Sequence, residues 1–197
     1  PAQFANASVV IVGHGAFAVE NMRTALENGA KHVTILCRRQ HLVLSTFCNW
    51  LLNSSQGALP VSDVIEVMRP FYRACGTNVE DLPSLVRDKN GDLTLDQTTV
   101  PAGSDLYFLA QMLGKLSIVV DEPQGFSANA VLTRGGRTLP ADVFLKCLGS
   151  NTDSTLIPTI FGADSQILGL WINGDPNLIT YNDGAQAPRQ VKSLMCA

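Results

Sequence analysis

VVIVGHGAFAVENM, from Val9 to Met22, is the stretch of sequence that decides the fold. Its first four residues form a β-branched apolar run, which is typical of a strand buried on both faces. Gly13 and Gly15 follow at once, and a helical pattern begins at Ala16. The spacing is GxGxxA, with Ala18 where the third glycine of a dinucleotide-binding fingerprint would stand. The stretch therefore predicts the first strand, turn and helix of a dinucleotide-binding fold.

Each small residue of this pattern has a physical role in the fingerprint. The first glycine allows the tight turn, the second lets a pyrophosphate approach the backbone, and the third small residue lets helix and strand pack closely. Backbone N–H groups at the helix start would hold the phosphates, and we expect Gly13, Gly15, Ala16, Phe17 and Ala18 to form this site. Phe17 is bulky enough to cover the loop. The alternative is a turn that keeps its glycines for geometry and binds nothing.

Two arginines follow the second predicted strand. The first helix is expected to end at Asn28-Gly29, and KHVTILCRR then supplies a strand over 33–37, which completes a βαβ unit. NAD-specific folds carry an acidic residue at the end of this strand, whereas this sequence has Arg38 and Arg39 there. Guanidinium groups bind a 2′-phosphate that a carboxylate would repel, so the pair favours NADPH over NADH. The alternative is two solvated arginines that end a strand.

Three histidines occur, and none lies in an HxxxH or HExxH pattern, so the sequence supports no metal site. His14 stands inside the glycine loop, where it either touches a phosphate or fills the loop.

The composition of the chain limits the classes of binding partner that we expect. The chain has 197 residues, of which 46% are hydrophobic and 16% charged, with a formal net charge of −3. This balance gives no electrostatic reason to expect nucleic acid or an anionic membrane as partner, and no apolar run is long enough to span a bilayer. The five cysteines are scattered without a CxxC motif, so we expect a reducing intracellular compartment. The first residue is Pro1, which suggests a processed chain or a section of a longer one.

The rest of the chain predicts an α/β domain of the Rossmann type. Its parallel sheet is expected from strands over 8–12, 33–37, 116–120 and 143–148. Residues 41–103 form an insertion with one or two helices, over 42–52 and 61–71. Within it, DKNGDLTLDQ (88–97) departs from a calcium loop in the position of its glycine and lacks the final glutamate, so it predicts a polar turn. A helix beginning after Ser104 and a hairpin turning at Gly135-Gly136 complete the expected elements.

The order of these pieces resembles the NADPH-binding half of flavin-dependent monooxygenases and related FAD/NAD(P) oxidoreductases. The matching stretches are VVIVGHGAFAVE, ILCRR, SDLYFLAQMLGKL, RGGRTLPADVFLKCLGSNTD and GLWINGDPNLITYND. In that family NADPH reduces FAD, and the reduced flavin activates oxygen. The resemblance implies that Gly13, Gly15 and Ala18 bind the pyrophosphate and that Arg38 and Arg39 bind the 2′-phosphate. It also places Gly149 near the junction of the two cofactors.

The resemblance is incomplete. Such flavoproteins begin with a GxGxxG of their own for FAD, and these 197 residues hold a single fingerprint. We therefore expect an NADP-binding domain over 1–148 and, over 149–197, part of the return into a missing FAD domain. Catalytic residues are not identified. Two functions remain open: the NADPH module of an oxidoreductase that meets an FAD-binding half, or a non-catalytic subunit of a larger assembly derived from such a flavoprotein.

Overall fold

The computed structural model describes residues 2–54, 59–96 and 101–149, together with three short strands further on. The chain divides into two units, Pro1–Gly149 and Ser150–Ala197. In the second unit the strands β12 (Leu170–Ile172), β13 (Leu178–Tyr181) and β14 (Arg189–Lys192) form an antiparallel sheet in that order. Most of the predicted return segment, 149–197, lies outside the described residues.

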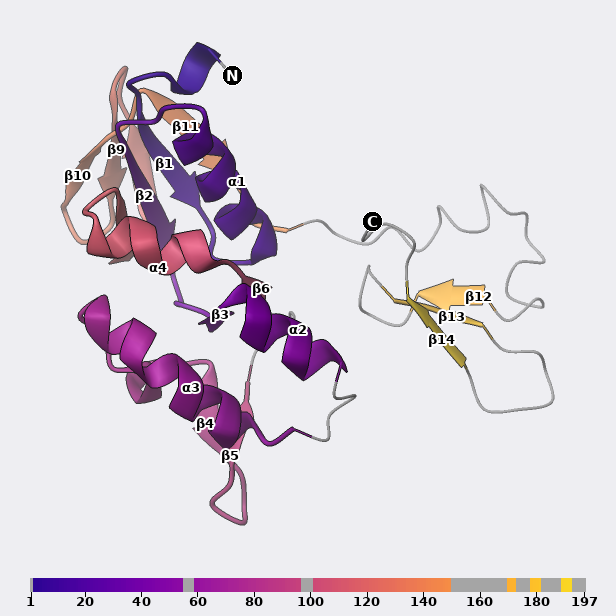
Figure 1. Cartoon of the computed structure of the whole chain (residues 1–197). Helices are drawn as coiled ribbons and strands as arrows, with labels where there is room; N and C mark the ends of the chain where they lie inside the picture. Colours follow the sequence, from indigo (N-terminus) through magenta and orange to yellow (C-terminus); the bar gives the residue numbers. More distant parts are fainter. Residues whose placement is uncertain are drawn as a thin grey trace. The chain divides into compact units, whose positions relative to one another are not determined.

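A four-stranded parallel sheet in the order β11-β1-β2-β7 forms the centre of the first unit (Figure 1). Its strands are β1 (Ser8–Val12), β2 (His32–Cys37), β7 (Leu116–Val120) and β11 (Val143–Lys146). All four were predicted from apolar runs, and the α/β class with a parallel sheet is confirmed. The last strand is two residues shorter than the predicted 143–148. The Cys147 N–H still donates to the Val12 carbonyl at 2.8 Å, and the Cys147 carbonyl lies against Gly13.

Both faces of the sheet are covered, which explains the unbroken apolar runs. Val9 and Ile11 face one core cluster with α1 (Ala16–Glu27) and α4 (Asp105–Met112), and the two helices pack against β1, β2 and β7. Val10 and Val12 face a second cluster with Val131 of β9. The strands β8 (Pro123–Phe126), β9 (Ala130–Thr133) and β10 (Thr138–Pro140) form an antiparallel sheet, and the predicted turn at Gly135-Gly136 joins its last two strands.

Helix ends follow local chemistry. Gly29 adopts a φ of 83° just after α1, as predicted for a glycine that ends a helix. Ser104 caps α4 by accepting a hydrogen bond from the Tyr107 N–H at 3.3 Å. A short 3₁₀ turn, η1 (Ala2–Phe4), precedes the first strand.

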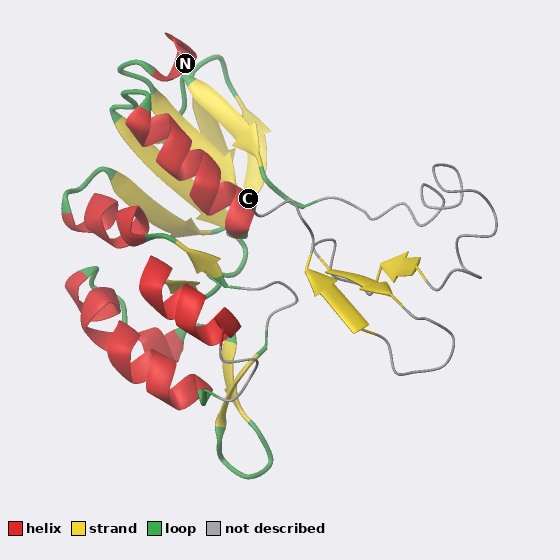
Figure 2. Cartoon of the chain, turned by 45° about the vertical axis from the view of Figure 1, so that its right-hand side comes forward, coloured by secondary structure: helices red, strands yellow, loops and turns green. Residues whose placement is uncertain are grey.

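The insertion over 41–103 builds a small region of its own next to the sheet (Figures 1 and 2). It contains two helices, one 3₁₀ turn and four short strands among its described residues. These are β3 (Val43–Leu44), α2 (Thr46–Ser54), α3 (Val61–Ala74), η2 (Val79–Asp81), β4 (Leu85–Arg87), β5 (Leu93–Leu95) and β6 (Ala102–Gly103).

Two expectations for the insertion have different outcomes. The helix predicted over 42–52 was wrong at its start, because Val43 and Leu44 pair in parallel with β6 and the helix begins at Thr46. The polar turn predicted over 88–97 is confirmed only for 88–92, where Asp88 Oδ1 accepts the N–H groups of Asn90 and Asp92 at 2.8 and 3.0 Å. Residues 93–95 are instead the strand β5, which pairs with β4. Across the described residues, none of the helices is long and apolar enough to cross a membrane.

The hydroxyl of Tyr72 ties α3 to the start of the insertion. It accepts the Val43 N–H at 2.8 Å and donates to the Val43 carbonyl at 3.0 Å, and the Tyr72 side chain is fully buried. Burial raises the pKa of this phenol above its ordinary value, so it stays neutral and able to donate.

Replacing Tyr72 by phenylalanine would leave the Val43 N–H and carbonyl in a dry site without these bonds. We expect Tyr72→Phe to lower the free energy of unfolding by about 1–3 kcal/mol, measured by urea denaturation. Ser127→Ala removes an exposed hydroxyl that donates to the Ala130 carbonyl, and it serves as the control with a change within about 0.5 kcal/mol. Equal losses for the two variants would contradict this role of Tyr72.

Candidate dinucleotide-binding site

The turn after β1 requires glycine at position 13 for steric reasons. Gly13 has a φ of 115°, and a Cβ placed there would lie 2.1 Å from the Cys147 carbonyl oxygen. Its N–H donates to the Leu36 carbonyl at 2.9 Å. The first glycine of the fingerprint therefore holds the turn tightly between the ends of the two neighbouring strands, which is the role predicted from the sequence.

The second glycine of the fingerprint faces open space. Gly15 is the N-cap of α1, and a Cβ at this position would have no heavy atom of the described residues within 4 Å beyond its chain neighbours and the helix backbone. The helix start has no side-chain cap and no acidic residue in its first turn. An uncapped N-terminus of a twelve-residue helix with an open approach is a site that fits an anionic phosphate.

Of the remaining residues of the fingerprint, Ala18 is buried and Phe17 is exposed. Ala18 is fully buried, so its small side chain lets α1 approach the sheet, as predicted. Ala16 begins the helix, and the Phe17 side chain beside it is 70% exposed.

His14 fills the interior of the loop and lies in a buried polar cluster. Its Nδ1 accepts the His41 N–H at 3.2 Å, so Nε2 carries the proton and donates to the Tyr107 hydroxyl at 3.0 Å. Gln40 donates to the same hydroxyl at 3.2 Å. His14 thus fills the loop, which was one of the two alternatives for this residue. Its hydrogen bonds connect the turn to α4 and to the start of the insertion.

Burial makes this cluster neutral. Desolvation, with a smaller contribution from the charge of His41, lowers the pKa of His14 to about 4. Burial also lowers the pKa of His41, and Arg39 adds to this effect. The pKa of the Tyr107 hydroxyl is raised by the same loss of water, so every group of the cluster is uncharged at neutral pH.

The two arginines at the end of β2 have separate environments. Arg39 donates to the Pro83 carbonyl, and it also bonds the carbonyl of Asp96 at 2.9 Å and its carboxylate at 3.0 Å. The Arg38 side chain is 80% exposed, and its Nε lies 3.9 Å from Oε1 of Glu122. The sequence has no acid beside the pair, whereas the fold brings one carboxylate to each arginine. The structure thus does not direct both guanidinium groups toward one ligand.

Gly149 follows β11 with a φ of 83°, and among the described residues no atom beyond its chain neighbours lies within 4 Å of a Cβ placed there. Since the strands are parallel, their carboxyl ends lie at the same edge of the sheet, so Gly149 lies on the edge that carries the fingerprint turn. Its predicted place between two cofactors stays a prediction.

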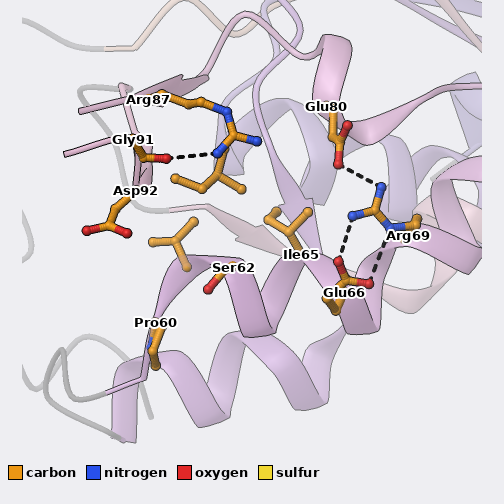
Figure 3. Close-up of a pocket in the computed structure, with 11 residues that line it drawn as sticks. Pro60, Ser62, Ile65, Glu66, Arg69, Glu80, Arg87, Gly91 and Asp92 are labelled. Carbon is orange, nitrogen blue, oxygen red and sulfur yellow. Dashed lines mark hydrogen bonds and ion pairs between the residues drawn. The ribbon is translucent and has the colours of Figure 1, made fainter. Parts of the chain in front are cut away.

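A pocket of about 490 Å³ lies in the insertion, between α3 and the hairpin β4-β5 (Figure 3). Arg69 in its wall pairs with Glu66 and Glu80, both at 2.8 Å, and the hydrogen bonds from Arg69 lower the pKa of the Glu66 carboxyl. Arg87 donates to the Gly91 carbonyl at 2.9 Å. Because its guanidinium groups already bond the pocket's own residues, this pocket is a weaker candidate for an anion site than the fingerprint turn.

Sequence reasoning missed the partners of the predicted residues. Tyr107 lay in an apolar helical run, and Glu122 in a predicted hairpin, with no spacing signal to join them to the fingerprint. No group of three or more His, Cys, Asp or Glu side chains that could hold a metal ion occurs within the described ranges. The four cysteines in those ranges, Cys37, Cys48, Cys75 and Cys147, are free thiols.

Comparison with known proteins shows that the sequence is similar to part of FAD-containing monooxygenases. The FAD-containing monooxygenase EthA of Mycobacterium tuberculosis is 26% identical over 211 residues, which cover 87% of this chain and 42% of that protein. The chain is homologous to part of an FAD-containing monooxygenase. The EthA protein of Mycobacterium bovis matches with the same identity and coverage, so the chain spans about two fifths of these curated relatives. No protein-family model matches this chain.

Solved structures of monooxygenases also align with this chain. Cyclohexanone monooxygenase from Rhodococcus sp. Phi1 bound to NADP+ is 14% identical with a TM-score of 0.43, over 74% of this chain and 39% of that one. The OTEMO complex with FAD and NADP is 12% identical with a TM-score of 0.46, over 76% of this chain and 39% of that one. The fold assignment rests on the sheet topology described above.

The two glycines of the fingerprint provide a matched pair of substitutions. We expect Gly13→Ala to lower the free energy of unfolding by about 3 kcal/mol, because the new methyl group meets the Cys147 carbonyl at a backbone angle that alanine disfavours. Gly15→Ala meets open space and should change stability by less than about 0.5 kcal/mol. Thermal or urea unfolding measures both, and a Gly13→Ala protein as stable as Gly15→Ala would refute the close approach.

The buried His14 also predicts a pH dependence of stability. Its pKa is about 4 in the folded protein and 6.5 for an ordinary solvated histidine, so the unfolded chain binds the proton more readily between these values. Stability should therefore fall by about 3 kcal/mol as the pH drops from about 6.5 to about 4, and be insensitive to this group above pH 7. His14→Gln should remove that part of the slope in urea denaturation series. An unchanged slope in the variant would contradict the assignment.

Proposed function

We propose that the chain is the NADPH-binding section of a flavin-dependent, monooxygenase-like oxidoreductase. The observation that carries the proposal is the open, uncapped start of α1 at Gly15, directly after the strand β1. A pyrophosphate could approach the backbone there without displacing a side chain. The homology to part of an FAD-containing monooxygenase supports the choice of a nicotinamide cofactor serving a flavin.

In this proposal the backbone around Gly15, Ala16 and Phe17 holds the pyrophosphate, and Arg38 binds the 2′-phosphate. Arg38 is the more available of the two arginines, since Arg39 bonds Pro83 and Asp96 in the insertion. NADPH supplies a hydride when bound, and FAD, held by another part of the protein or by a partner, would receive it. The role of this chain is then to bind and orient the nucleotide.

A second function, a non-catalytic structural subunit, is favoured by apolar side chains on the surface. Phe47 and Trp50 of α2 are 65% and 61% exposed, and their ring centroids lie 6.2 Å apart. Such a pair suits contact with another protein surface. The intact mass of the native protein and its visible spectrum discriminate between the two functions. A flavin absorbance supports the oxidoreductase, and a colourless 21.1 kDa chain co-purifying in fixed ratio with a large complex supports the subunit.

Nucleotide binding is tested by calorimetric titration with NADPH and NADH. We expect NADPH to bind more tightly, and Arg38→Ala/Arg39→Ala to lose this preference, with Arg38→Ala alone weakening NADPH binding about tenfold. Arg39→Ala alone should act mainly on stability, because Arg39 joins β2 to the insertion.

Gly15→Ala provides a folded control for this titration. Its methyl group would stand where the pyrophosphate approaches, so it should weaken both nucleotides alike. Equal affinity of the native chain for NADPH and NADH, or an unchanged preference in the double arginine variant, would disprove the proposal.

A further inference from the structure

Glu122 lies beside the arginine that the proposed function assigns to the 2′-phosphate. β7 is the neighbour of β2 in the parallel sheet, and the ladder continues past both strands because the Asp121 N–H donates to the Cys37 carbonyl at 2.9 Å. The register pairs Cys37 with Val120, so Arg38 follows β2 opposite Asp121, and Glu122 is one residue further along. Their side chains approach to 3.9 Å between Oε1 and Nε.

A second arginine reaches the same carboxylate from the hairpin β9-β10. Arg134 lies 2.9 Å from Oε2 of Glu122, whereas Arg38 lies 1 Å further from the other oxygen. Both guanidinium groups are largely exposed, at 80% for Arg38 and 76% for Arg134, while the Glu122 side chain is 37% exposed. The carboxylate is thus bonded closely by Arg134 and only loosely by Arg38.

The backbone holds Arg134 in this position. Its N–H donates to the Glu122 carbonyl at 2.8 Å, so the two residues are joined through the main chain as well as through their side chains. The following N–H, of Gly135, donates to the Asp121 carboxylate at 3.1 and 3.2 Å. A Cβ on Gly135 would lie 2.6 Å from the same carboxylate, so this turn sits directly against the end of β7.

We propose that Glu122 and Arg134 set the selectivity of this site between NADPH and NADH, with Arg134 holding the Glu122 carboxylate so that Arg38 can bind a 2′-phosphate. The inference rests on the proposed function. A 2′-phosphate carries between one and two negative charges at neutral pH, so Glu122 repels it and competes with it for Arg38. The 2′-hydroxyl of NADH lacks that charge and can donate to a carboxylate. Glu122 therefore disfavours NADPH relative to NADH, and Arg134 limits this effect.

The two residues should act in opposite directions on NADPH. In calorimetric titrations at low ionic strength, we expect Glu122→Gln to tighten NADPH binding about three- to fivefold, with little gain for NADH. Arg134→Gln should weaken NADPH binding by a similar factor, because the released carboxylate then pairs with Arg38. Arg137→Gln, in the same turn, removes the same charge without a bond to Glu122 and should leave the NADPH to NADH ratio unchanged.

The double variant Glu122→Gln/Arg134→Gln tests whether Arg134 acts through Glu122. We expect it to match Glu122→Gln, because no carboxylate remains for Arg134 to hold. A further loss of NADPH affinity on adding Arg134→Gln would overturn the positioning role and make Arg134 a direct phosphate ligand. An unchanged NADPH to NADH ratio in Glu122→Gln would overturn the role of Glu122. A native chain that binds neither nucleotide would instead refute the proposed function, and the inference with it.

Discussion

The contact between Gly13 and the Cys147 carbonyl is the constraint on which the first unit depends. The ends of β1 and β11 approach so closely there that a single methyl group would not fit between them. The Gly13 N–H at the same time reaches the end of β2 through the Leu36 carbonyl. One residue without a side chain thus fixes the relative positions of three strand ends. The start of α1, which follows three residues later at Ala16, is directed by the same turn.

The parts of the fold that the sequence predicted are those determined by neighbouring residues. Strands buried on both faces carry their apolar pattern within five or six residues, as in Val9 to Val12, and Gly29 ends its helix by a local backbone conformation. The start of α2 was predicted wrongly because Val43 and Leu44 pair with residues 102 and 103, almost sixty positions away. Apolar periodicity cannot distinguish such a two-residue strand from the first turn of a helix.

In the candidate site, too, features set by neighbouring residues could be predicted, and features set by distant residues could not. Gly13, Gly15 and Ala18 have the packing environments that their spacing indicated, because the fingerprint describes one continuous turn. The carboxylates beside Arg38 and Arg39 could not be predicted, since they come from elsewhere in the chain. Asp96 reaches Arg39 from the insertion, and Glu122 reaches Arg38 from the connection between β7 and β8. Sequence reasoning can assign a charge to a strand end, but it cannot count the opposite charges that the fold brings to it.

The insertion shares one hydrophobic core with the sheet. Ile11 and Ile35 of the sheet belong to the same buried cluster as Ile65, Met68 and Tyr72 of α3. Hydrogen bonds from His41 to His14 and from Arg39 to Asp96 join the two regions at the surface of that core. Because this core is shared, we expect the first unit to unfold as one cooperative block, without an opening of the insertion that leaves the sheet intact. Amide hydrogens in α3 and in β1 should then exchange through the same global event.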